Sequence, residues 1–281
     1  MAAPMSDIER LFGGDRAVPG MRQSSLVPPA PFESDLEPPS DAVESPGIAA
    51  GTDADELPPH EDAPQFPVVV LDPLKIGGEL RGALSDVARA ERLRLLRTEI
   101  LLRHRTQRGA IAVAVVGAGA GEGRSLLAAE LALSLAQLNR STLLIDADMR
   151  HPRQHLLFGT QLHDGLAQAI ERGETTSLYG VEGYDALSLM TAGICPAKPI
   201  ELLSDGRFEL LMDELRSTYD YIVVDTPSCS DFADGLVIST VIGHVLTVHR
   251  APYTSYKAAR AMLRQLASSR ADILGAVINN F

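Results

Sequence analysis

The sequence predicts an α/β domain with a mainly parallel sheet covered by helices on both faces. Short apolar runs that suit buried strands alternate with stretches of helical periodicity. The expected strands lie near 110–116, 142–146, 187–190, 221–225, 244–249 and 273–278. The expected helices lie near 86–105, 124–139, 199–216, 234–241 and 255–268. This alternation indicates crossover connections, and ligands then bind at the carboxyl ends of the strands.

The first 66 residues differ from the rest in composition. They hold 13 Asp and Glu but 3 Arg and Lys, and they are rich in proline. Such a segment cannot bury enough apolar surface to offset the entropy of ordering it. We therefore expect a disordered acidic arm over 1–66, a linker over 67–85 and a folded domain over 86–281. The arm could serve as a tether or docking segment, or as a passive solubilising tail.

Several classes of protein are excluded by composition. No apolar run approaches the ~18 residues of a membrane span, and the start lacks a signal peptide's basic end and apolar core. Cys195 and Cys229 are too few for a disulfide framework, and Cys229 is expected to be a small buried residue. No basic patch with interleaved aromatics indicates nucleic-acid binding. We predict a cytoplasmic protein that does not bind nucleic acid.

A glycine-rich loop after the first buried run indicates a phosphate site. The run Val113–Val116 ends in Gly117–Gly123, and a helical pattern follows. The next apolar run ends in Asp146 and Asp148. Loop amides and the positive helix end suit phosphate oxygens, while carboxylates at the next strand tip suit Mg²⁺. This order of parts is that of a P-loop nucleotide site.

The loop departs from the usual P-loop pattern G-x-x-x-x-G-K-[ST]. The aligned residues run from Ala118 to Ser125, so the first glycine is alanine and the lysine is Arg124. Lysine is a compact charge on a thin stem, whereas arginine is a wide planar fork. Arg124 can still pair with phosphate, but we expect it to displace the γ-phosphate geometry that phosphoryl transfer needs.

A third element supports the P-loop. The stretch Tyr219–Pro227 is an apolar strand ending in Asp225, a Walker B pattern placed to hold the metal through water. Two other interpretations stay open. A dinucleotide site could use Asp146 for a ribose, although strict G-x-G-x-x-G fails from Gly117 and from Gly119. A glycine-rich turn without a ligand is the other.

The helix expected over 86–105 carries Glu91, Arg94 and Arg97 at i, i+3 and i+6, which places them on one broad polar face. By spacing alone this is a solvated face whose ion pairs contribute a few tenths of a kcal/mol. The motifs taken together suggest more. In chain order they are Glu91-x-x-Arg94-x-x-Arg97, Gly121-Glu122-Gly123, Asp146-x-Asp148-x-Arg150-x-Pro152, a segment from Thr191 to Ser204, and Asp225-Thr226-Pro227.

Over about 86–281 this series resembles the bacterial tyrosine kinases, the P-loop autokinases of capsule and exopolysaccharide synthesis. The opening MSDIER resembles the stand-alone, exosortase-associated members. The resemblance implies a fold shared with MinD-type P-loop NTPases and binding of ATP or ADP with Mg²⁺. It also implies a ring-shaped homo-oligomer and a membrane-bound polysaccharide chain-length or co-polymerase partner that recruits the chain to the inner membrane face.

The resemblance also assigns roles to residues of this sequence. Asp146 becomes the base for a tyrosine hydroxyl, with Asp148 as the second Walker A′ carboxylate and Arg124 in the place of the catalytic lysine. Ser125, Asp148 and Asp225 become metal ligands. Asn279 becomes an adenine contact, and Glu91, Arg94 and Arg97 become a contact between subunits. The nucleotide would be held by Gly119, Ala120, Gly121, Glu122, Gly123, Arg124, Ser125 and Leu126.

Two departures from the family pattern shape the functional hypotheses. One is Arg124. The other is the family's tyrosine cluster after the last strand, since all six tyrosines here lie between Tyr179 and Tyr256, which we expect inside the fold. The favoured hypothesis is an ATP- or ADP-binding regulator of exopolysaccharide or capsule polymerisation and export, weakly active or inactive as a kinase. The alternatives are an active tyrosine kinase, a nucleotide-binding scaffold without turnover, and a MinD/ParA-type ATPase, whose signature lysine would stand at Gly119.

Overall fold

A computed structural model describes residues 68–71, 76–104, 109–174, 178–251 and 253–280. The arm expected over 1–66 lies outside the described residues. The elements below belong to a unit that spans Pro64–Phe281. No helix within these described ranges is long and apolar enough to cross a membrane.

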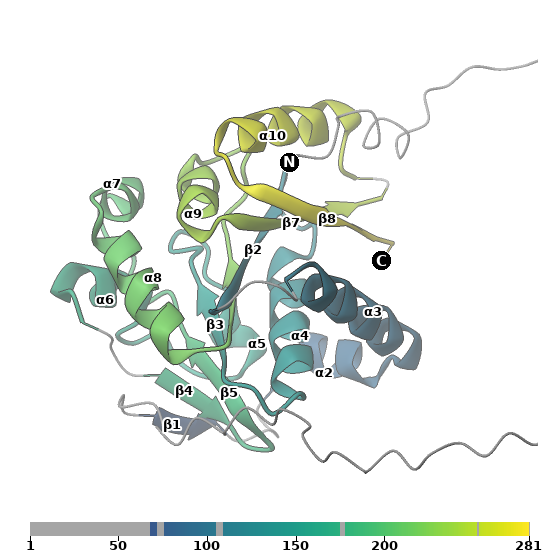
Figure 1. The fold of residues 1–281 in the computed structure, drawn as a ribbon, viewed down its shortest axis with the longest axis vertical. Coiled ribbons are helices and arrows are strands. Elements are labelled where there is room, and N and C mark those ends of the chain that lie inside the picture. Colours follow the sequence, from purple (N-terminus) through teal and green to yellow (C-terminus); the bar gives the residue numbers. More distant parts are fainter. Residues whose placement is uncertain (1–67, 72–75, 105–108, 175–177, 252, 281) are drawn as a thin grey trace, which may run out of the picture. The chain divides into compact units, whose positions relative to one another are not determined.

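An eight-stranded sheet forms the centre of this unit, in the order β1-β4-β5-β3-β6-β2-β7-β8 (Figure 1). The strands are β1 (Val68–Leu71), β2 (Ile111–Gly117), β3 (Thr142–Asp146), β4 (Leu178–Val181), β5 (Tyr184–Met190), β6 (Tyr221–Asp225), β7 (His244–Arg250) and β8 (Asp272–Asn279). The β4–β5 pair is antiparallel, and the other neighbouring pairs are parallel. The expected mainly parallel sheet is confirmed.

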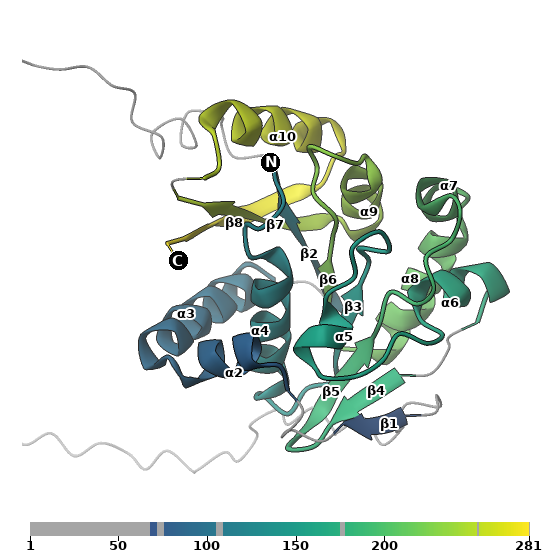
Figure 2. The ribbon, with the colours of Figure 1, turned by 180° about the vertical axis from the view of Figure 1, so that it is seen from behind.

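Helices cover both faces of the sheet, as the two opposite views show (Figures 1 and 2). The helices are α2 (Gly78–Ser85), α3 (Val87–Arg103), α4 (Arg124–Ala136), α5 (Gln154–Leu157), α6 (Leu166–Arg172), α7 (Pro199–Ser204), α8 (Arg207–Thr218), α9 (Asp234–Ile242) and α10 (Tyr256–Ser268). Helices α2 to α5 share one core with the sheet, and α6 to α10 share the other.

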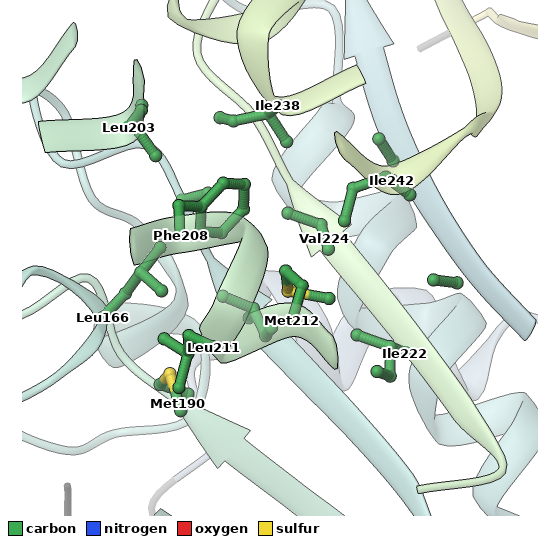
Figure 3. Packing of buried hydrophobic residues seen from close by; sticks show 14 of the residues in the cluster. Leu166, Met190, Leu203, Phe208, Leu211, Met212, Ile222, Val224, Ile238 and Ile242 are labelled. Carbon is green, nitrogen blue, oxygen red and sulfur yellow. The ribbon is translucent and has the colours of Figure 1, made fainter. Parts of the chain in front are cut away.

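The two cores follow from the alternation of side chains along each strand. On β6, Ile222 and Val224 belong to one core, while Val223 points to the other. Phe208 and Met212 of α8 are fully buried over Ile222 and Val224 (Figure 3). Burial on both faces explains why these strands are continuous apolar runs in the sequence.

The structure adds elements that the sequence pattern did not predict. Strand β4 and the short helices α5 and α6 were not expected, and the helix expected over 199–216 is two helices. Gly206 separates them with a φ of 87°, a left-handed conformation that glycine adopts without strain. Part of the expected linker is also folded, because it contains β1 and α2, and Leu80 of α2 is fully buried.

Strand register brings the predicted motifs together at one edge of the sheet. β2, β3 and β6 are parallel neighbours, and Asp225 at the end of β6 lies opposite both Val115 of β2 and Asp146 at the end of β3. The loop after β2 therefore opens beside the two carboxylates. The sheet order places β6 and β3 on one side of this loop and β7 and β8 on the other.

Candidate nucleotide site

The loop between β2 and α4 has the backbone of a phosphate cradle. Gly121 and Gly123 have φ angles of 73° and 91°, which side chains with a β-carbon rarely adopt. Gly123 is the N-terminal cap of α4 and has no side chain to occupy the first N–H groups of the helix. Those N–H groups and the positive end of a 13-residue helix suit an anion.

A cavity of about 400 Å³ lies over this loop. Its volume is within the range of small-molecule pockets. Its lining residues are Glu79, Ala120, Gly121, Glu122, Gly123, Arg124, Ser125, Leu126, Asp148, His151, Arg153, Leu157, Ser228, Asp231 and Arg250. The predicted loop residues 120–126 and Asp148 are thus brought to one cavity. Gly119, Asp146, Asp225 and Asn279 lie around it and are not among these lining residues.

Asp225 is a fully buried carboxylate beside the loop. One oxygen, Oδ2, accepts a hydrogen bond of 2.9 Å from Gln154 Nε2, while Oδ1 is buried without a hydrogen-bond partner. Burial raises the pKa of Asp225 to about 6, against the opposing effects of the Ser125 hydroxyl and the Arg124 charge. A buried, unpartnered anionic oxygen next to a serine hydroxyl is a suitable ligand for a hard cation.

Asp146 is also fully buried, but both of its oxygens are engaged. Oδ1 accepts from the Asp148 N–H at 3.2 Å, and Oδ2 accepts from the N–H groups of Arg153 and Gln154 at 3.0 and 2.9 Å. Burial, then the charge of Asp225, raises the pKa of Asp146 well above its ordinary value. In this conformation Asp146 fixes the backbone from Asp148 to Gln154. Because both oxygens are occupied by these hydrogen bonds, the conformation disfavours the predicted role of Asp146 as a base.

Mg²⁺ fits the residues on this side of the loop. Among the described residues, no group of three or more His, Cys, Asp and Glu side chains is arranged to hold a metal ion alone. Magnesium in nucleotide sites uses one or two carboxylates together with phosphates and water, so such a group is not required. Ser125, Asp148 and Asp225 offer a hydroxyl and two carboxylates of this kind.

Arg124 is folded against the loop that it follows. It is 9% exposed, and its Nη1 points to the Gly117 carbonyl at 3.5 Å. A β-carbon added at Gly117 would lie 3.0 Å from Arg124 Cδ, so the stem packs on the end of β2. The arginine charge therefore stays at the lysine position and lines the cavity, while its stem packs on the end of β2.

Gln154 is a site residue that the sequence analysis missed. It is fully buried, and its Nε2 donates to the Ser125 carbonyl and to Asp225 Oδ2, both at 2.9 Å. Its backbone N–H also bonds Asp146. One glutamine thus joins α4, β6 and the end of β3. The signal in the sequence was its place two residues after Asp146-x-Asp148-x-Arg150-x-Pro152, which a local pattern could not convert into contacts.

The other side of the loop is held by β7, by β8 and by the segment between β7 and α10. Thr254 Oγ1 donates to Glu122 Oε1 at 2.5 Å, Asn279 Nδ2 donates to the Glu122 carbonyl at 2.7 Å, and Arg250 Nη1 donates to the Gly121 carbonyl at 3.3 Å. Asn279 is 5% exposed, and this bond occupies its amide nitrogen, so an adenine contact would use its other atoms. The adenine role remains a prediction.

Two residues noted in the sequence, Arg150 and Cys229, do not line this cavity. Arg150 makes a bidentate ion pair with the buried Asp234 at 2.7 and 3.2 Å, which ties the end of β3 to α9. Cys229 is buried as expected, and burial raises its pKa to about 11. It therefore stays a thiol near neutral pH and is a poor nucleophile.

The helix motif divides between surface and core contact. Glu91 and Arg94 form an exposed ion pair at 2.5 Å on α3. Arg97 instead donates from Nη1 to the Ser134 carbonyl of α4 at 2.5 Å. The three residues therefore do not present one free face: Glu91 and Arg94 are available to a neighbouring molecule, while Arg97 helps to fix α3 on α4.

Comparison with known proteins gives the family. A family model described as cellulose biosynthesis protein BcsQ matches residues 111–280. Tyrosine-protein kinase YwqD of Bacillus subtilis (strain 168) is 32% identical over 192 residues, which cover 68% of this chain and 80% of YwqD. The chain belongs to the bacterial tyrosine kinase-like P-loop proteins. The putative tyrosine-protein kinase CapB of Staphylococcus aureus is 28% identical over 210 residues, covering 74% of this chain and 90% of CapB.

Some relatives are much longer, and the chain spans 31% of tyrosine-protein kinase ptk of Acinetobacter johnsonii. Solved structures agree with the family. The chimerical protein CapA2B2 matches with a TM-score of 0.66 at 25% identity, over 77% of this chain and 95% of that one. The kinase domain of Escherichia coli ETK matches with a TM-score of 0.63 at 26% identity, over 68% and 75%. MinD of Pyrococcus furiosus, at 19% identity and a TM-score of 0.52, over 62% and 73%, shows the P-loop NTPase fold alone.

Proposed function

We propose that the chain binds Mg²⁺-ATP and Mg²⁺-ADP at the loop 119–125 and acts as a regulator of exopolysaccharide or capsule polymerisation and export. The observation that carries nucleotide binding is the buried, unpartnered Oδ1 of Asp225 beside Ser125, at the mouth of a glycine-capped helix. The polysaccharide role rests on the likeness to capsule kinases. Bound Mg²⁺ supplies neutralisation of phosphate charge, while the loop N–H groups bind and orient the phosphates.

Weak or absent kinase activity is part of this proposal. Arg124 keeps its charge but packs on Gly117, and Asp146 has both oxygens bonded to backbone N–H groups. Phosphoryl transfer depends mostly on positioning around the γ-phosphate, so these two features disfavour efficient transfer. Asp146 would act as a base only after the chain from Asp148 to Gln154 releases it.

Calorimetric titration with Mg²⁺-ATP and Mg²⁺-ADP tests nucleotide binding. We expect binding by the wild type and by Arg124→Lys, and its loss in Asp225→Asn, which keeps the shape of the site but removes the metal-binding charge. Absence of heat with both nucleotides in the wild type and in Arg124→Lys would refute the nucleotide site. The control is Asp213→Asn, because Asp213 lies on the exposed side of α8.

An active tyrosine kinase is the second candidate, and one observation favours it. The sequence analysis placed all six tyrosines inside the fold, yet Tyr253 is 73% exposed and Tyr256 is 49% exposed. Tyr253 stacks on the Arg250 guanidinium at 4.5 Å, and Arg250 lines the cavity. Phosphotyrosine detection after incubation with Mg²⁺-ATP separates the two candidates. Strong labelling of the wild type that is abolished by Asp146→Asn would establish the kinase.

Assembly through α3 and recruitment by a membrane-bound co-polymerase complete the proposal. Glu91 and Arg94 are exposed and paired, so the charges are available for a neighbouring subunit or the partner. We place the working chain in the cytoplasm at the inner membrane face. Sedimentation with nucleotide should show oligomers of the wild type that a Glu91→Ala/Arg94→Ala double variant lacks. Identical sedimentation of both would show that Glu91 and Arg94 form only a solvated surface ion pair.

A further inference from the structure

The cavity is lined by a positively charged side chain, that of Arg153, which no part of the P-loop pattern predicts. Arg153 lies at the start of α5, and its backbone N–H donates to Asp146 Oδ2 at 3.0 Å, which fixes the base of the side chain to a buried carboxylate. Its side chain is 51% exposed and lines the cavity. A long side chain that is fixed at its base and exposed at its tip can reach a ligand in this cavity.

The Arg153 guanidinium is held by a carboxylate from α2. Its Nη2 lies 3.0 Å from Glu79 Oε2, and the Glu79 side chain is 53% exposed and lines the same cavity. α2 is docked beside α5, because the Gly77 N–H donates to the Leu157 carbonyl at 2.8 Å and Leu80 is fully buried. Exposed ion pairs of this kind contribute little and exchange readily with other anions.

The three arginines of the cavity differ in how firmly they are held. Arg124 is 9% exposed and packs on Gly117, and the Arg250 guanidinium donates to the Gly121 carbonyl and stacks over Tyr253. The partner of Arg153 is a half-exposed carboxylate that a stronger anion can displace. A phosphate carries more charge than a carboxylate and matches the planar guanidinium fork.

The sheet order decides which phosphate lies near Arg153. Asp225 and Asp148, the carboxylates proposed to bind the metal, lie on the β6–β3 side of the loop. A Mg²⁺ ion held by Ser125, Asp148 and Asp225 would neutralise phosphate charge here, so we expect the terminal phosphate on this side. The Arg153 backbone N–H donates to Asp146 at the end of β3, and its side chain lines the cavity, so Arg153 lies on the side expected for the terminal phosphate.

We propose that Arg153 binds the terminal phosphate of a nucleoside triphosphate and that Glu79 is the internal anion which occupies Arg153 in the absence of nucleotide. The inference rests on the proposed nucleotide site and deepens it. Arg153 supplies the movable charge that the lysine supplies in ordinary P-loops, while the stem of Arg124 stays packed on Gly117. Binding of a triphosphate breaks the Arg153–Glu79 contact, whereas binding of a diphosphate leaves it in place.

Calorimetry on the full chain tests the pair of residues with Mg²⁺-ATP and Mg²⁺-ADP. Arg153→Ala should weaken ATP binding on the order of tenfold, the effect of one charge-assisted hydrogen bond, and should change ADP binding by less than about twofold. Arg153→Lys should restore part of the ATP affinity. Glu79→Gln should strengthen ATP binding by about threefold, because the competing anion is lost. Arg172→Ala is the matched control, since Arg172 forms an exposed ion pair with Asp164 away from the cavity.

The outcomes separate this inference from the proposed function. Equal weakening of ATP and ADP in Arg153→Ala would show a structural role and overturn the inference. Unchanged ATP-to-ADP preference in both Arg153→Ala and Glu79→Gln would overturn it while leaving the nucleotide site intact. A wild type that binds neither nucleotide would remove both. Thermal melts of each variant identify loss of folding, which Arg153→Lys avoids because it keeps the stem and the charge.

Discussion

The two flanks of the P-loop are built on opposite principles. The carboxylate flank, formed by Asp146, Gln154 and Asp225, gathers negative charge in full burial and leaves Asp225 Oδ1 without a partner. The amide flank, formed by Arg250, Thr254 and Asn279, donates hydrogen bonds to the loop itself. The first flank holds carboxylate charge that a cation would balance, while the second fixes the shape of the loop.

The carboxylate flank is therefore suited to bind a cation, and the amide flank is suited to support the loop. Two buried carboxylates facing each other in register repel, and burial alone already disfavours their charged forms. A fold keeps such an arrangement where a cation relieves it, so the carboxylate flank is expected to reduce stability in the absence of metal. The amide flank should do the reverse, since each of its bonds satisfies a loop oxygen. Removing a carboxylate charge from the first flank and removing a donor from the second should therefore change stability in opposite directions.

The largest expected effect is on the carboxylate flank. Asp225→Asn should raise the free energy of unfolding by about 3 kcal/mol near pH 7.5 without Mg²⁺ or nucleotide. The pKa of Asp225 rises from 3.8 in its ordinary state to about 6 in the fold. Between these values the folded state binds more protons than the unfolded state. The stability from this group is therefore present at about pH 4 and is lost as the pH rises to about 6.

Urea denaturation of the wild type and Asp225→Asn from about pH 4 to pH 8 measures this effect. The two curves of stability against pH should approach each other at the acid end, diverge between about pH 4 and pH 6, and run parallel above that. A variant that is less stable than the wild type near pH 7.5 would contradict the proposed repulsion. It would also make the two flanks alike.

The second prediction concerns the residue that links the carboxylate flank together. Gln154→Leu should lower the free energy of unfolding by about 2 kcal/mol, because the Ser125 carbonyl and Asp225 would lose a buried donor. It should also raise the pKa of Asp225 further, since that bond favours the charged form. Gln137→Leu, at an exposed position after α4, is the control for helix and size effects. A neutral result for Gln154→Leu would mean that water replaces the amide.

The smallest expected effect is on the amide flank. Thr254→Val should lower the free energy of unfolding by about 1 kcal/mol, because Oγ1 would no longer donate to Glu122 or accept from the Arg250 N–H, and should weaken ATP and ADP binding equally. Equal weakening follows from loss of loop shape rather than loss of a phosphate contact. Thr240→Val, exposed on α9, is the control. Preferential loss of ATP binding in Thr254→Val would show that this flank contacts the terminal phosphate.

The sequence predicted the carboxylate flank much better than the amide flank. Asp146, Asp148 and Asp225 follow directly on buried runs, and parallel strands bring such ends to one edge of a sheet. Gln154 and Thr254 stand in loops and at a helix start with no periodic pattern around them. Their contacts join residues 71 and 132 positions apart, which no local signal encodes.

The same limit applies to the fold. The six expected strands are present, but β4 was not predicted. It is short, and a four-residue segment before a turn carries little periodicity. The prediction of one helix over 199–216 overlooked Asp205-Gly206. This pair is a stop signal that the apolar spacing on both sides obscured. In α3 the polar motif was placed on one face, yet Arg97 reaches across to α4, because long stems let charged side chains cover a neighbouring helix.

β1 has a mechanical consequence for the site. This strand pairs with β4 along four residues, parallel and in register, and α2 with Glu79 follows it in the chain. A load applied to the chain at Val68 meets this ladder first, along the strand direction, so several hydrogen bonds must yield together before tension passes to α2. Such a load is thus absorbed at the edge of the sheet, and without nucleotide Glu79 is expected to stay on Arg153 until β1 has left β4.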